Sequence, residues 1–136
     1  MQITTKTEYA VRALSELASS SDGKPLSIAH ICKAQSLPAK YMEQIFRKLK
    51  QNNLVTSIQG SQGGYLPVEN FADISLKDIV QSVEDRKAVC DCDTIDYCSG
   101  NPCGLQKLWN EIQNNIDDYF EQIKFDKILS FLNKEI

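Results

Sequence analysis

Four of the five cysteines in this 136-residue chain fall within fourteen residues, at Cys90, Cys92, Cys98 and Cys103. Thiolates bind soft and borderline metals, and several of them on one flexible loop can wrap a zinc ion or an iron–sulfur cluster. Three aspartates among these cysteines oppose burial of the stretch in an apolar core. The paired C-x-x-C spacing of a structural zinc site is absent, which favours iron and sulfide over zinc. Unliganded thiols or a transient disulfide switch are the alternative.

The fifth cysteine and the single histidine lie elsewhere in the chain. Cys32 falls on the apolar face of an expected helix, so we predict a small buried residue there. His30, near the start of the same helix, is expected to contact solvent or a phosphate and not a metal. The sequence holds no Ser/His/Asp set, phosphate-binding glycine loop or dinucleotide fingerprint. We therefore predict that the chain is not an enzyme.

A second group of polar side chains follows Pro38, which suits the first position of a helix running to about residue 52. The apolar series of this helix starts at Tyr41 or Met42 and ends at Leu49. In a DNA-reading helix, residues near the N-terminus meet base edges, and Lys and Arg further along reach phosphates. An ordinary solvated helix face is the alternative. The candidate DNA-contact residues on this helix are Lys40, Tyr41, Glu43, Gln44, Arg47, Lys48 and Lys50.

The charge distribution favours a nucleic-acid partner for the first half only. The net charge is −3, but residues 1–66 carry eight Lys and Arg against four acids, whereas residues 67–136 carry seven against fourteen. A basic half of this kind suits phosphate binding despite the acidic average. Within it, Gln44 can pair bidentately with adenine, and Glu43 can accept a hydrogen bond from the amino group of cytosine.

The expected elements of the first half form a winged helix-turn-helix. Apolar periodicity predicts helices over residues 5–20, 28–34 and 38–52, the last two joined by a tight turn. Two short strands over residues 54–58 and 65–68 flank a glycine-rich turn and form a hairpin, the wing. The wing turn offers Gln59 and Ser61 as DNA contacts and lacks the arginine that narrow minor grooves attract.

The second half predicts a dimerisation arm. Ser75 and Asp78 open a capped helix that ends near residue 83. An apolar near-heptad series over about 19 residues from Leu105 needs a partner surface, which two-fold self-association supplies. We divide the chain into a DNA-binding domain (1–83), a cysteine-rich loop (84–104), and a dimerisation helix with a capping helix (105–136). The predicted fold class is mainly α with a small β-hairpin wing. Without a membrane-length apolar run or a signal-like start, we expect a cytoplasmic protein with reduced thiols.

These features together resemble the Rrf2 family of winged-helix transcriptional regulators, in particular its IscR- and NsrR-like members. The resemblance covers essentially the whole chain, and its specificity comes from the order and spacing of five motifs. They are Ile3-Thr-Thr-Lys-x-x-Tyr9-Ala-Val-Arg-Ala-Leu14, Tyr41-Met-Glu-Gln-Ile-Phe46, Ser57-Ile-Gln-Gly-x-x-Gly-Gly-Tyr65, Ile74-Ser-Leu-Lys-Asp-Ile79 and Cys103-x5-Trp109.

The resemblance implies a homodimer on double-stranded DNA whose cysteine loop holds a [2Fe–2S] or [4Fe–4S] cluster near the recognition helices. Gln106 stands where some members have a histidine ligand. Glu8 matches an acidic ligand that other members take from the first helix of the partner subunit, and Cys90 competes with it for the fourth position. The remaining ligands implied by matching positions are Cys92, Cys98 and Cys103.

Oxidation, nitrosylation or loss of such a cluster would change the order of the loop and thereby the spacing of the two recognition helices. One departure from the pattern concerns DNA: Gln59 stands where many members have arginine, which argues against insertion of the wing into the minor groove. Glu43, by contrast, matches an acid that tunes site choice in the family. Two other readings stay open. One is a regulator of the same family that works without a cluster, by zinc or a thiol switch, as in cysteine metabolism. The other is an iron–sulfur redox protein that does not bind DNA.

Overall fold

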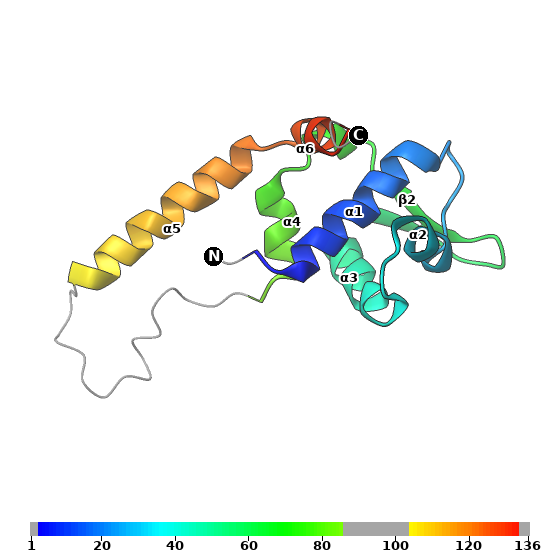
Figure 1. Cartoon of the computed structure of the whole chain (residues 1–136), viewed down its shortest axis with the longest axis horizontal. Coiled ribbons are helices and arrows are strands. Elements are labelled where there is room, and N and C mark those ends of the chain that lie inside the picture. Colours follow the sequence, from blue (N-terminus) through cyan, green and yellow to red (C-terminus); the bar gives the residue numbers. More distant parts are fainter. Residues whose placement is uncertain (1–2, 86–103, 134–136) are drawn as a thin grey trace.

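The computed structural model describes residues 3–85 and 104–133, which form a helical body with a projecting hairpin and a projecting long helix (Figure 1). The cysteines at 90, 92, 98 and 103 therefore lie outside the described residues. In chain order the elements are α1 (Thr5–Ser20), α2 (Ile28–Gln35), α3 (Ala39–Gln51), β1 (Val55–Ile58), β2 (Gly64–Pro67), the 3₁₀ turn η1 (Phe71–Asp73), α4 (Leu76–Val83), α5 (Gly104–Gln122) and α6 (Phe125–Leu132).

The central helix α1 begins at a side-chain cap and packs through small residues. The Thr4 hydroxyl accepts a hydrogen bond from the Lys6 backbone N–H at 3.2 Å, which satisfies one of the free donors at a helix start. Its buried face combines Ala10 and Ala13 with two leucines, and the alanines let the neighbouring helices approach closely. The predicted range of 5–20 is confirmed.

A tight turn joins α2 to α3. The Ser27 hydroxyl caps α2 by accepting from the His30 N–H, and Ser36 then turns the chain in the left-handed conformation, with φ 54°. The buried face of α3 is apolar and starts at Met42, which is fully buried, whereas Tyr41 is 56% exposed. The apolar series of this helix therefore starts at Met42 and not at Tyr41. Both ends of the observed helix lie within one residue of the predicted range, 38–52.

The wing is an antiparallel hairpin that is anchored on both sides. Its strands pair from Val55 opposite Pro67 to Ile58 opposite Gly64. Tyr65 also exchanges two backbone hydrogen bonds with Leu26, at 2.8 and 2.9 Å, just before α2. Its ring lies 4.6 Å from that of Phe46 on α3. The base of the wing is thus held against α3 and against the segment that leads into α2.

The end of the chain returns to this body. Ser75 and Asp78 form the predicted capping box of α4. Phe125 of α6 is fully buried in the same core cluster as the α1 residues, with its ring 4.5 Å from that of Phe71. Backbone bonds from Leu76 N–H to Ile123 and from Phe125 N–H to Ile74, both 2.8 Å, fix the junction between α5 and α6 against α4.

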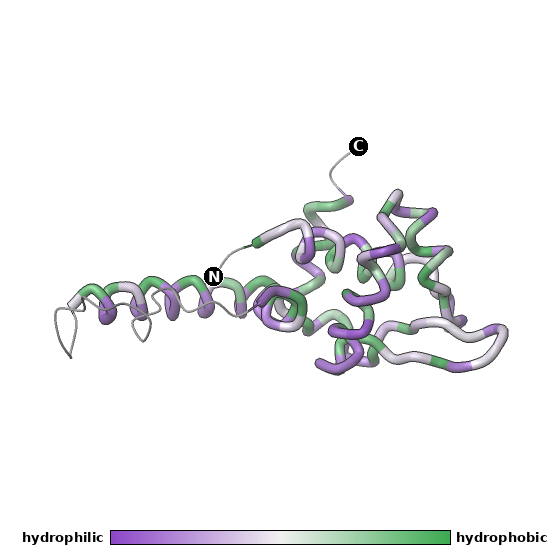
Figure 2. The backbone as a smooth tube through the Cα atoms, turned by 90° about the horizontal axis from the view of Figure 1, so that it is seen from below, coloured by the Kyte–Doolittle hydropathy of each residue, from purple (hydrophilic) through white to green (hydrophobic). Residues whose placement is uncertain are grey.

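Helix α5 projects from this anchored end with no buried residue along its length. One side of the helix is apolar and the other polar (Figure 2), and its exposed apolar residues include Leu105, Leu108, Ile112 and Tyr119. Within the described ranges, no helix is long and apolar enough to cross a membrane. The mainly α fold with a hairpin wing is confirmed.

Candidate nucleic-acid interface

The exposed surface of α3 consists of two neighbouring strips of side chains that run along the helix. Because successive helical residues turn by about 100°, the positions 40, 43, 47 and 50 share one strip and the positions 41, 44 and 48 share the next. The structure leaves all of these side chains exposed except Lys48, which is half-buried. The seven predicted contact residues of this helix are therefore brought together on one surface. We call the first strip, Lys40, Glu43, Arg47 and Lys50, the outer strip.

The outer strip carries three cations that have no ion-pair partner within 4 Å among the described residues. These are Lys40, Arg47 and Lys50, with the Glu43 carboxylate between them in the sequence. Unpaired cations on an exposed helix face can neutralise phosphates without first breaking an internal pair. The side of α3 that points away from the core is thus suited to an extended polyanion.

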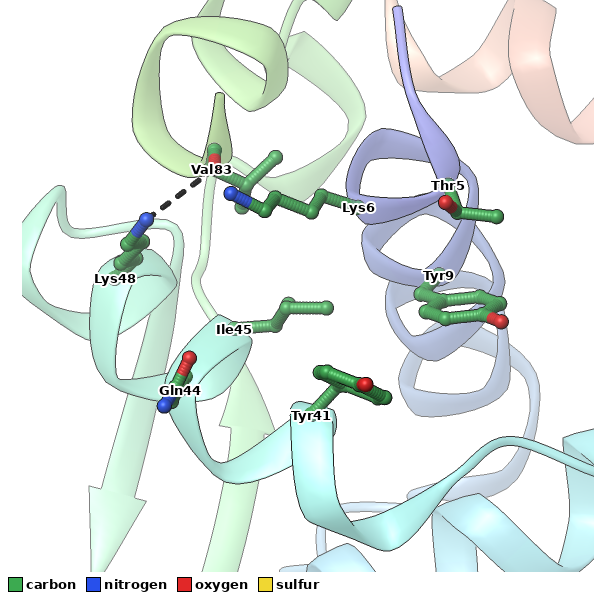
Figure 3. Close-up of a pocket in the computed structure, with 8 residues that line it drawn as sticks. All are labelled: Thr5, Lys6, Tyr9, Tyr41, Gln44, Ile45, Lys48 and Val83. Carbon is green, nitrogen blue, oxygen red and sulfur yellow. Dashed lines mark hydrogen bonds between the residues drawn. The ribbon is translucent and has the colours of Figure 1, made fainter. Parts of the chain in front are cut away.

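The second strip borders a pocket of about 340 Å³ between α3 and the start of α1 (Figure 3). Tyr41 and Gln44 line it from α3, and Tyr9 lines it from α1. The Lys6 side chain extends from α1 across the pocket towards α3, and the Lys48 amine donates to the Val83 carbonyl at 3.5 Å. The pocket therefore has an aromatic end and a basic end.

At the basic end, two amines meet one carboxylate. Lys6 Nζ lies 3.4 Å from Asp85 Oδ2, and Lys48 Nζ lies 3.8 Å from Asp85 Oδ1. Neither Lys6 nor Asp85 was singled out from the sequence, because 79 residues separate them and no local pattern marks the pair. Lys48, by contrast, was predicted as a DNA contact, and the structure places it in this ion-pair cluster.

Glu84, next to Asp85, caps the N-terminal end of α1 with its side chain. Its Oε1 accepts three hydrogen bonds, from the Thr4 backbone N–H at 2.9 Å and from the Thr4 and Thr7 hydroxyls at 2.6 and 2.8 Å. Burial raises the pKa of the Glu84 carboxyl, but these hydrogen bonds outweigh it, so the pKa lies below its ordinary value of 4.5. The chain that leads to the cysteine-bearing stretch is thus attached to the first turn of α1.

The wing tip carries the other two predicted DNA contacts. Gln59 and Ser61 are exposed in the turn between the strands, beside Gly60, whose φ of 116° favours glycine. Ile58 is also 45% exposed at the end of β1. The tip therefore offers short polar groups and one apolar side chain, and no cation among residues 58–64.

Of the predicted cluster ligands, the described residues include Glu8 alone. Its side chain is 61% exposed on the first turn of α1, and its Oε1 lies 3.8 Å from Arg12 Nη1. Arg12 also donates to the backbone carbonyl of Gln35 at the end of α2. Among the described residues, no group of three His, Cys, Asp or Glu side chains could hold a metal ion. Because the Glu8 carboxylate is exposed, it is accessible to a metal cluster of a partner subunit, as the resemblance implies.

Cys32 is 7% exposed on α2, as predicted for a packed residue. Burial raises the pKa of the Cys32 thiol, so this thiol stays protonated and is a poor ligand and nucleophile.

Comparison with known proteins gives one consistent result. The family described as Rrf2, iron-dependent transcriptional regulator, matches residues 3–130. The HTH-type transcriptional regulator IscR of Pectobacterium atrosepticum is 31% identical over 137 residues, covering all of this chain and 82% of the relative. The structure of IscR from T. potens is similar in fold, with a TM-score of 0.73 at 24% identity, over 100% of this chain and 92% of that one. CymR, the global cysteine regulator of B. subtilis, gives a TM-score of 0.71 at 25% identity, over 96% and 98% of the two chains.

Proposed function

We propose that this chain, which belongs to the Rrf2 family of DNA-binding transcriptional regulators, binds operator DNA as a homodimer whose affinity is set by an iron–sulfur cluster. The main support for the DNA interface is the outer strip of α3, on the second helix of a helix-turn-helix. Its three cations have no ion-pair partner in the part of the chain that the structure describes. Such a helix fits the major groove, where the pattern of donors and acceptors is unique to each base pair.

The proposed contacts follow from position along α3. Tyr41, Glu43 and Gln44 lie in its N-terminal half and face base edges, whereas Arg47 and Lys50 lie further along and face phosphates. The remaining proposed contacts are Lys40 and Lys48 on α3, and Gln59 and Ser61 on the wing, which rest on the backbone because they lack the charge to enter a narrow minor groove.

The proposed dimer forms through α5. An isolated helix whose apolar side faces solvent gains by covering it, and a two-fold pair covers two such sides at once. The α5 residues that would form the interface include Leu105, Leu108, Ile112 and Tyr119. A two-fold axis then sets the two copies of α3 about 34 Å apart, one turn of DNA, if they read successive major grooves.

The proposed cluster is held by Cys92, Cys98 and Cys103, with Glu8 of the partner subunit or Cys90 as the fourth ligand. Three thiolates and one carboxylate are a donor set that suits iron in a cluster, and the exposed Glu8 side chain can leave Arg12 at little cost. When bound, the cluster supplies a centre that responds to redox change or nitric oxide. Glu8 stands on α1, which packs against α3, so a ligand at this position acts on the helix that supports the DNA-reading surface.

Two measurements on the full chain test this function. Fluorescence anisotropy with duplex from the promoter of the gene itself, at two salt concentrations, should show binding that weakens steeply with salt. Anaerobic purification should give a brown dimer with iron and sulfide, and Cys92→Ala, Cys98→Ala and Cys103→Ala should each be colourless. An affinity that does not change with salt concentration would contradict the proposed DNA interface. A colourless wild-type protein without iron would contradict the proposed cluster.

A cluster-free regulator is the second candidate, favoured by the likeness to CymR over nearly the whole of both chains. In that case the wild type and the three cysteine variants would bind the same duplex equally well, with or without iron. A cysteine variant that loses iron and also changes its affinity for DNA would support the cluster-dependent regulator over the cluster-free one.

A further inference from the structure

The cluster of Lys6, Lys48 and Asp85 joins three parts of the fold at one point. Lys6 comes from the first turn of α1, Lys48 from the last turn of α3, and Asp85 from the segment that follows α4. Each lysine amine faces a different oxygen of the same carboxylate, at 3.4 and 3.8 Å. Two ammonium groups that share one two-oxygen anion form the arrangement that also holds a phosphate, whose non-bridging oxygens present the same pair of acceptors.

This cluster lies beside the surface of α3 that is proposed to face DNA. Lys48 shares its strip of α3 with Tyr41 and Gln44, which line the same pocket. The Asp85 side chain is 71% exposed, and those of Lys6 and Lys48 are 48% and 37% exposed. Exposed ion pairs of this kind are weak and exchange readily, so another anion at high local concentration can take the place of the carboxylate.

We propose that Lys6 and Lys48 form a binding site for one backbone phosphate of the DNA, and that Asp85 fills this site when DNA is absent. The inference rests on the proposed function, since it requires that α3 faces the duplex. It adds Lys6 as a DNA contact from α1, and it makes Asp85 an internal competitor of the nucleic acid. Because the ligand is a phosphate and not a base, the competition acts on operator and unrelated sequence alike.

The test compares single variants of the full chain by anisotropy with promoter duplex and with an unrelated duplex. Asp85→Asn should tighten binding to both duplexes by about two- to fivefold, the factor expected for releasing exposed ion pairs. Lys6→Gln and Lys48→Gln should each weaken binding to both duplexes and lower the salt slope by about 1. Asp22→Asn, at an exposed turn residue just beyond the far end of α1, changes the net charge equally and should leave both affinities nearly unchanged.

A triple variant, Lys6→Gln/Lys48→Gln/Asp85→Asn, separates competition from a general charge effect. The gain from Asp85→Asn should disappear when both lysines are absent. If the gain persists there, or if Asp85→Asn binds like the wild type, the phosphate site is wrong while the DNA interface stands. If the wild type binds neither duplex, the proposed function fails, and this inference fails with it.

Discussion

The hydrogen bonds to Glu84 allow a quantitative test of how the second half of the chain is attached to the first. Glu84→Gln keeps the size of the side chain and removes its charge. The single oxygen Oε1 now accepts from the Thr4 N–H, the Thr4 hydroxyl and the Thr7 hydroxyl, all within 2.9 Å. Thr7 is only 2% exposed, so its hydroxyl has little access to water as a substitute partner.

The expected loss follows from three hydrogen bonds that change from charged to neutral. Hydrogen bonds to an ionised acceptor are roughly twice as strong as neutral ones, and their net value is about 1.5–3 kcal/mol against about 1 for a neutral bond. The carboxylate also interacts favourably with the positive end of α1, by about 0.3–1 kcal/mol. Because the three bonds share one oxygen they are not additive, and we expect Glu84→Gln to lower the free energy of unfolding by about 1–2 kcal/mol.

The direction of the pKa shift predicts how the contribution of Glu84 to stability changes with pH. The pKa of Glu84 in the folded protein lies below its ordinary value of 4.5. Its contribution to stability is therefore complete above that value and is lost as the pH falls through the folded pKa. The difference between wild type and Glu84→Gln should be constant from pH 7 to about pH 5 and shrink below that range.

Urea denaturation at one fixed protein concentration, from pH 7 down to pH 3, measures both quantities. Glu69→Gln, an exposed position after β2, is the matched control and should change the free energy of unfolding by less than about 0.5 kcal/mol. A loss at Glu84 no larger than that at Glu69, or a loss that is independent of pH over the whole range, would refute the reasoning.

Three further predictions concern the wing, α3 and α5. Gly64→Ala should lower the melting temperature, because the added Cβ collides with the backbone carbonyl just before α2, and a loss of about 1–3 kcal/mol is expected. Gln44→Ala should relax base preference by about 1–3 kcal/mol at one position, whereas Arg47→Ala should weaken all duplexes and reduce the salt slope by about 1; competition with single-base variants of the operator distinguishes them. Leu108→Glu should give monomers in sedimentation velocity, and Asn110→Glu, on the same helix, should not.

Local signals in the sequence account for most of the secondary structure. Ser27 and Ser75 cap the helices that were predicted from them. The stop at Gly23 and Pro25 likewise agrees with the end of α1 at Ser20. Caps, turns and apolar periodicity act within a few residues, so they can be read from the chain directly. The short turn η1 was missed because three residues leave no periodic trace.

Contacts between distant segments could not be predicted in this way. Nothing near Glu84 indicates that its carboxylate would cap α1, nor does anything near Leu26 indicate that it would pair with Tyr65 on the wing. Such pairs depend on how helices pack in three dimensions, and a polar residue in a loop has no preferred partner in its own sequence. The sequence could group the exposed polar residues of α3 because one helix carries them, whereas the Lys6–Asp85 pair joins two distant segments and could not be predicted.

The junction between α5 and α6 determines how a dimer through α5 would act on DNA. Two backbone hydrogen bonds of 2.8 Å and the buried Phe125 ring fix this junction to α4, and the Lys77–Glu121 pair at 3.7 Å adds a contact along the last turn of α5. Since α4 packs against both α1 and α3, a rotation of α5 at its base cannot be absorbed by a free linker. In the proposed dimer, a change in the crossing of two paired α5 helices would therefore move the two copies of α3 as rigid bodies, which is the geometric requirement for a change at α5 to control the fit to DNA.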